Sequence, residues 1–160
     1  MEAFAKGDLP GMHLVFTGGP TAELANCIEH FHVTQRVYFA GAVPETRLPS
    51  LYRSAEALVF PSLYEGFGLP ILEAMACGTP VVTANVTAMP EVAGGAALLV
   101  DPTSVEQIAR AMEQILSDTT LRQQLRHKGL IRSAEFSWAG TAATVRELIK
   151  GGAQPRHETN

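Results

Sequence analysis

Two glutamates on either side of a glycine-rich turn are the part of the sequence best suited to bind a ligand. Glu65 and Glu73 flank residues 66–69 (Gly-Phe-Gly-Leu), and Pro70 follows that turn. Glycine lets the main chain approach a ligand closely, and proline suits the first turn of a helix, where its missing amide hydrogen costs nothing. Free amides and the positive end of a helix dipole favour an anion such as phosphate. Because carboxylates accept hydrogen bonds from sugar hydroxyls, the pattern predicts a nucleotide-sugar pocket.

The same residues are also typical of an ordinary turn between a strand and a helix. Glycine and proline often mark such turns, and a glutamate near the start of a helix is commonly only a favourable charge beside the dipole. The surrounding sequence therefore has to decide between a ligand site and a plain turn.

The length and composition are those of one globular domain, which we place at residues 1–150. The chain has 160 residues, of which 46% are hydrophobic and 18% charged. No apolar run approaches the ~20 residues that span a membrane, and the first residues do not resemble a signal peptide. We expect a cytoplasmic protein, with peripheral attachment to the inner membrane left open. Residues 151–160 have little to bury, and we predict a mobile tail there.

Charge and cysteine content argue against two other classes of partner. The formal net charge is −4 and no basic stripe is visible, which argues against nucleic acid. Cys27 and Cys77 lack the spacing of a metal motif, and the five histidines are scattered. We therefore predict no metal site and no cofactor other than a nucleotide-sugar substrate.

Apolar runs alternating with helical patterns predict the fold. Five short runs rich in Val, Leu and Phe are typical of buried strands: residues 13–17, 37–41, 57–61, 80–84 and 97–101. Helical patterns lie between and after them: residues 21–31, residues 70–77, and three segments after residue 103. This order predicts an α/β fold with a doubly wound, Rossmann-like parallel sheet.

Three details refine this prediction. Thr103 and Glu106 have the spacing of a capping box that would begin a helix, and Gly78 stands where a left-handed helix end is usual. Trp138 is expected to be a core anchor or a hinge contact for the last helix rather than a platform on which a sugar stacks. Because ligands of open α/β sheets bind beyond the carboxyl ends of strands, residues 65–70 are well placed for binding.

A long block of sequence resembles a known family. Residues 60–82 read FPSLYEGFGLPILEAMACGTPVV, and further matching runs occur at residues 90–96, 100–102 and 136–138. These runs resemble the C-terminal, donor-binding half of retaining GT-B glycosyltransferases, in the large group called glycosyltransferase family 4 or group 1. The resemblance covers nearly the whole chain except the tail.

The resemblance implies a role for each residue of the motif. Its donor-site residues would be Glu65, Gly66, Phe67, Gly68, Leu69, Glu73 and Val43. Glu73 would hold the ribose hydroxyls, since a carboxylate can accept from both members of a diol. Glu65, the catalytic candidate, would position the donor sugar, and the amides of residues 66–69 would face the sugar and diphosphate. Val43 would offer its backbone to the base.

Proteins of this family transfer a sugar, here expected to be a hexosyl group, from a nucleoside diphosphate to an acceptor with retention and without a metal. Dipoles and cations aimed at the departing diphosphate would lower the barrier. This chain has no counterpart of the acceptor-binding domain or of the Arg and Lys that grip the diphosphate, and Lys6 does not match that clamp. We therefore expect the isolated chain to bind donor weakly and not to turn over.

The strand that opens the family's donor domain is also without a counterpart. It would lie between the strands at residues 13–17 and 57–61, so its absence would leave two edges unpaired. Unpaired edges recruit other strands. We expect re-pairing within the chain, a strand from a second copy, or a companion polypeptide that supplies one.

Two alternative functions stay open at this stage. A non-catalytic module that binds a nucleotide sugar and serves a partner protein would explain the same motif. A nucleotide-sugar epimerase with the same architecture is a further alternative, although the seven-residue spacing between Glu65 and Glu73 argues against it.

Overall fold

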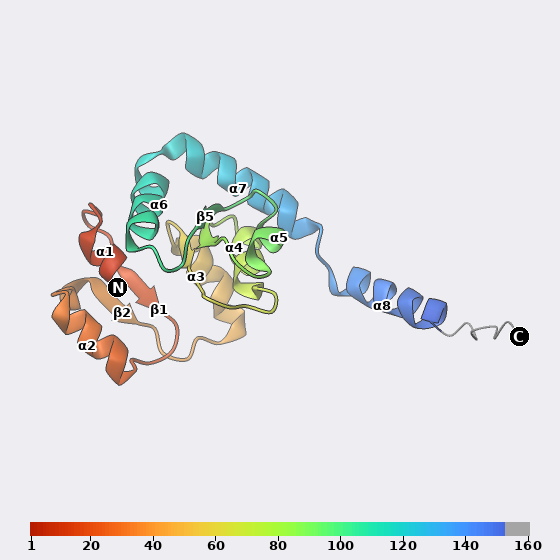
Figure 1. The fold of residues 1–160 in the computed structure, drawn as a ribbon, viewed down its shortest axis with the longest axis horizontal. Helices are drawn as coiled ribbons and strands as arrows, with labels where there is room; N and C mark the ends of the chain where they lie inside the picture. The colour runs from red at the N-terminus through yellow and green to blue at the C-terminus, as the bar shows by residue number, and fades with distance from the viewer. Residues whose placement is uncertain (153–160) are drawn as a thin grey trace, which may run out of the picture.

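A computed structural model describes residues 1–152, which form helices packed around short parallel strands (Figure 1). The helices are α1 (Glu2–Lys6), α2 (Ala22–His30), α3 (Leu48–Ser54), α4 (Leu69–Ala76), α5 (Met89–Ala93), α6 (Val105–Ser117), α7 (Thr119–Ala134) and α8 (Trp138–Gly152), with 3-10 turns η1 (Thr34–Arg36) and η2 (Glu45–Arg47). The strands are β1 (Leu14–Phe16), β2 (Val37–Phe39), β3 (Leu58–Phe60), β4 (Val81–Ala84) and β5 (Leu98–Val100). All five predicted strands are present, each shorter than its apolar run.

The strands form two separate parallel sheets. β1 pairs with β2, while β4 lies between β3 and β5 in the second sheet. In Figure 1 β1, β2 and α2 lie on the left, and α4 and α5 lie beside β5 near the centre. Parallel strands joined by helices confirm the predicted α/β class.

No strand pairing joins β1 to β3 within residues 1–152. The predicted break in the sheet is therefore confirmed, and it lies between the two strands where the sequence placed it. The expected re-pairing within the chain does not occur in the described residues.

The core around α4 and β4 fixes the position of the glycine-rich turn. Every residue of β4 is buried, as are Ile71, Ala74 and Met75 of α4. α7 packs along α4, and Gly129 permits this approach because a Cβ there would lie 3.1 Å from the Met75 side chain. Gly78 ends α4 in the left-handed region (φ 73°), as the sequence predicted.

Two details of the sequence prediction were wrong. Ser104, not Thr103, caps α6, because Thr103 gives its amide and hydroxyl hydrogens to Asp101. Trp138 is not a core anchor: it is 81% exposed, on a helix that extends away from the other elements (Figure 1). Helical periodicity predicts that α8 has an apolar face, but it does not say whether an element in this chain covers that face.

The remaining expectations concern the tail and the membrane. α8 continues to Gly152, and the rest of the predicted tail lies outside the described residues. None of the helices in residues 1–152 combines the length and the apolar character needed to cross a bilayer.

Candidate functional site

The glycine-rich turn connects the carboxyl end of β3 to the start of α4. Gly68 precedes the helix with φ 98° and ψ 46°, and Pro70 lies in the first turn. A side chain at Gly68 would be strained by this left-handed conformation, and its Cβ would lie 3.1 Å from the Ile71 side chain. Gly66 differs, because a Cβ there would meet only open space. The fold requires a glycine at position 68, whereas it leaves the space beside position 66 free.

The backbone amides of this turn have no partner among the described residues. α4 has no side-chain cap, and none of the backbone hydrogen bonds found outside the regular elements is donated by residues 66–69. The first amides of a helix need an external acceptor, which water or an anion can supply. A row of free donors at the positive end of α4 is therefore suited to bind a phosphate group.

Glu73 is held by a residue that the sequence analysis did not identify. The Tyr52 hydroxyl, on α3, donates to Glu73 Oε2 at 2.9 Å, and Glu73 itself is exposed. The Tyr52 carbonyl in turn accepts from the Thr79 hydroxyl at 2.7 Å, which ties α3 to the chain just after α4. One carboxylate oxygen of Glu73 is thus fixed, and the other accepts no hydrogen bond from the described residues.

The environment of Tyr52 favours its neutral, hydrogen-donating form. Burial raises the pKa of the Tyr52 phenol well above its usual value of 10.0, and the hydrogen bond and charge of Glu73 raise this pKa further. Tyr52 therefore stays a donor to Glu73 at any physiological pH.

Glu65 is fixed through its backbone. Its amide donates to Thr87 Oγ1 at 3.4 Å, and the Glu65 side chain is half-buried. Thr87 lies in the loop after β4 with φ 55°, which is uncommon for a β-branched residue. Through this hydrogen bond Thr87 links two loops at the carboxyl edge of the sheet.

A contact between two aromatic rings supports the glycine-rich turn. The rings of Phe67 and Phe136 meet edge to face, with centroids 5.9 Å apart, and the Arg132 guanidinium lies 4.6 Å from the Phe136 ring centroid. Phe67 is nonetheless 43% exposed. The position of the turn thus depends on the segment that joins α7 to α8.

The sequence analysis also named Leu69, Val43 and Lys6, which differ in their distance from the rest of the turn. Leu69 is exposed at the first position of α4. Val43 is half-buried in the loop after β2, and no hydrogen bond in the described residues joins it to the turn. Lys6 pairs with Glu2 on α1 at 2.6 Å, so it is engaged within its own helix.

The described residues include no group of three or more His, Cys, Asp or Glu side chains arranged to hold a metal ion. A cavity of about 620 Å³ lies between the two sheets; Tyr52 and Pro70 line it, but Glu65 and Glu73 do not. Glu65 and Glu73, which the sequence analysis assigned to a donor site, therefore lie outside this cavity.

Comparison with known proteins identifies relatives over most of the chain. The family model described as "Glycosyl transferases group 1" matches residues 1–131. The O-antigen chain mannosyltransferase B of Escherichia coli is 49% identical over 102 residues, which are 64% of this chain and 27% of that protein. A D-inositol 3-phosphate glycosyltransferase of Corynebacterium diphtheriae is 36% identical over 89% of this chain and 35% of its own length. The chain thus spans about a third or less of these curated relatives.

Solved structures agree with this family. Sucrose-phosphate synthase from Thermosynechococcus elongatus superposes with a TM-score of 0.82 at 28% identity, over 93% of this chain and 40% of that protein. The C-terminal domain of a glycosyl transferase group 1 family protein from Francisella tularensis gives a TM-score of 0.73 at 29% identity, over 84% and 75%. Anabaena Alr3699/HepE, solved in complex with UDP and glucose, shares the fold with a TM-score of 0.84 at 24% identity, over 94% of this chain and 43% of that protein.

Proposed function

The chain belongs to the group 1 glycosyltransferases, and on this premise we propose that it is the donor-binding part of a retaining enzyme. The donor is a nucleoside diphosphate sugar whose hexosyl group passes to an acceptor held by another part of the enzyme. Since close relatives are named mannosyltransferases, mannose is the first sugar to test. Alone, the chain binds donor weakly and does not transfer it, because an acceptor must also be positioned.

Each element of the site has a distinct role in this proposal. The amides of residues 66–69 receive the diphosphate and the sugar, and Val43 offers its backbone to the base. Glu73 binds the ribose diol through the oxygen that Tyr52 does not occupy. Glu65 positions the donor sugar at the reacting carbon. As the bond to the sugar breaks, the developing charge on the diphosphate is stabilised by dipoles that are already oriented, without a metal ion.

The observation that carries the proposal is the turn before α4, whose backbone amides have no hydrogen-bond partner among the described residues. Free amides in residues 66–69 precede a helix whose second turn presents a carboxylate fixed by Tyr52. Any helix start leaves free amides, so the acid that Tyr52 fixes beside them is what distinguishes this turn from an ordinary strand-to-helix connection.

Calorimetric titration of the chain with UDP-, GDP- and ADP-sugars tests the site. One nucleotide should bind best, and Glu73→Ala should weaken its binding roughly tenfold or more, because hydrogen bonds to a charged group contribute about 1.5–3 kcal/mol. Excess EDTA should leave the affinity unchanged.

Glu29→Ala is the matched control, since Glu29 is also exposed on a helix but lies on α2. Its binding should equal that of the parent chain. Equal binding by the parent and Glu73→Ala would contradict the placement of the ribose, and loss of binding in EDTA would contradict the metal-free site.

A further inference from the structure

A second cavity lies at the opposite end of the strands from the glycine-rich turn. Its volume is about 410 Å³, and it is lined by the ends of α3 and α4, by the start of α7 and by Pro80. Pro80 directly precedes β4, so the cavity is at the amino edge of the second sheet, whereas residues 66–69 follow the carboxyl end of β3. The cavity and the turn are therefore separate places on the molecule.

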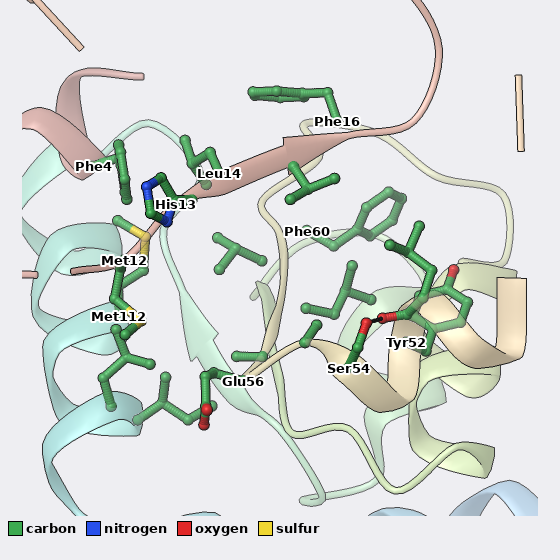
Figure 2. Close-up of a pocket in the computed structure, with 18 of the residues that line it drawn as sticks. Phe4, Met12, His13, Leu14, Phe16, Tyr52, Ser54, Glu56, Phe60 and Met112 are labelled. Atoms are coloured by element: carbon green, nitrogen blue, oxygen red, sulfur yellow. Dashed lines mark hydrogen bonds between the residues drawn. The ribbon is translucent and has the colours of Figure 1, made fainter. Parts of the chain in front are cut away.

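The lining of this cavity is polar and basic, unlike that of the cavity between the sheets. Figure 2 shows the larger cavity bordered by apolar side chains such as Phe4, Phe60 and Met112. Three arginines, one glutamate and uncharged polar residues line the smaller one, among them Arg53, Arg122, Arg126, Glu56, Gln123 and Thr119. In a chain whose formal net charge is −4, three arginines beside one carboxylate form a local excess of positive charge.

The structure holds two of these arginines at the cavity. Arg122 Nη1 donates to the Ile115 carbonyl at 3.1 Å and to the Leu116 carbonyl, which fixes this guanidinium at the end of α6. The Arg126 guanidinium lies against the backbone of Gly78, where a Cβ would be 3.0 Å from Arg126 Nε. The missing side chain at Gly78 thus leaves room for a guanidinium beside the end of α4.

Cations near the carboxyl ends of helices can also serve only to balance helix dipoles. The last turns of α3 and α4, however, already receive backbone hydrogen bonds from the Ala55 and Gly78 amides. Arg53 and Arg126 form no ion pair within residues 1–152. Each helix end carries about half an elementary charge, so three guanidinium groups exceed the charge of three helix ends even when Glu56 is counted. The remaining positive charge is available to an external anion.

We propose that this cavity binds a phosphate or diphosphate group, at a site distinct from the glycine-rich turn. A guanidinium presents paired N–H donors that match two phosphate oxygens. Arg53 on α3 and Arg126 on α7 bring such donors to the cavity from two elements, and Gln123 adds an amide donor. Soluble phosphate esters and phospholipid headgroups present the same anion. The site does not depend on the proposed function, because it shares no residue with the donor surface.

NMR titration of the isotope-labelled full chain with inorganic pyrophosphate tests the proposal. The Gly78 and Gln123 amide signals and the Arg126 side-chain signal should shift together and saturate with one affinity. Shifts confined to residues 66–69 would place pyrophosphate at the glycine-rich turn alone, which would overturn this proposal and leave the donor site standing. Shifts at the cavity without any at residues 66–69 would support the proposal and count against the donor site.

Charge-matched variants separate the cavity from a general attraction of anions to α7. Arg53→Gln and Arg126→Gln each remove one guanidinium from the cavity, whereas Lys128→Gln removes an exposed cation of α7 that does not line it. Each arginine substitution should weaken pyrophosphate binding roughly fivefold or more, because a charge-assisted hydrogen bond is lost. Lys128→Gln should bind pyrophosphate like the parent. Equal affinities of the three variants would overturn the proposal.

Vesicle flotation identifies the source of the phosphate group. The chain is mixed with phosphatidylcholine vesicles that contain or lack phosphatidate. Flotation that requires phosphatidate and is lost in Arg126→Gln but kept in Lys128→Gln would support the site and assign it to a headgroup. Pyrophosphate binding at the cavity without such flotation would support the site and assign it to a soluble ester. If neither pyrophosphate nor phosphatidate distinguishes Arg126→Gln from Lys128→Gln, the cavity is no phosphate site.

Discussion

At the scale of single residues, the hydrogen bond from Tyr52 to Glu73 makes a specific prediction. Tyr52→Phe removes the hydroxyl but keeps the ring, so Glu73 loses its orienting partner while α3 keeps its packing. We expect donor affinity to fall roughly fivefold, which corresponds to about 1 kcal/mol for one hydrogen bond. Calorimetry with the best-binding nucleotide sugar measures the change. In the Glu73→Ala background the tyrosine substitution should have no further effect, and additive losses would show that Tyr52 does not act through Glu73.

The same variant gives a pH readout that a purely steric role would not give. The folded pKa of Tyr52 lies above its unfolded value, so the unfolded chain releases this proton first as the pH rises. The contribution of Tyr52 to stability is therefore complete below about pH 10 and declines above it. Urea unfolding at about pH 8 and pH 11 should show a steeper loss of stability for the parent than for Tyr52→Phe. An equal loss of unfolding free energy between about pH 8 and pH 11 in the parent and in Tyr52→Phe would contradict the raised pKa of Tyr52.

At the scale of elements, Arg132 of α7 fixes the end of α5 and the support of the glycine-rich turn. Its Nε and Nη2 donate to the Val92 and Glu91 carbonyls at 3.0 and 2.6 Å, and its guanidinium lies on Phe136. Arg132→Met should lower the free energy of unfolding by about 1–3 kcal/mol, because carbonyls at the end of α5 lose their donors. Lys128→Met, an exposed position one turn earlier, should change it by less than about 0.5 kcal/mol. Urea unfolding curves of the two variants compare these effects, and equal losses would refute this role of Arg132.

Elements also show what the sequence could and could not predict. Strands and long helices were predictable because apolar runs and helical periodicity are local signals. α3 has seven residues, too few for a clear period, and for this reason Tyr52 was missed. The glycine-rich turn was found from residue types alone, whereas Thr87 and Phe136 approach it only through the fold. The exposure of Trp138 depends on whether another element covers α8, which periodicity cannot reveal.

At the scale of the whole molecule, the break between the two sheets and the glycine-rich turn are neighbours. β3 borders the cavity between the sheets, and the segment that follows β3 carries residues 66–69, whose amides have no partner among the described residues. The proposed phosphate site of the donor therefore lies at the carboxyl edge of the second sheet, next to the break.

A chimera tests the proposed function. The part of the Escherichia coli mannosyltransferase B that lies outside the matching region is joined to this chain. Sugar transfer, undetectable with the chain alone, should appear in the chimera and fall about a hundredfold or more with Glu65→Ala, since a misplaced reacting sugar loses the advantage of orientation. A radiolabelled sugar assay measures transfer, with Glu29→Ala as the control. A chimera that binds donor tightly but transfers nothing would instead favour the non-catalytic binding module. The enzyme assignment would then be wrong for this chain, even though the donor surface itself is real.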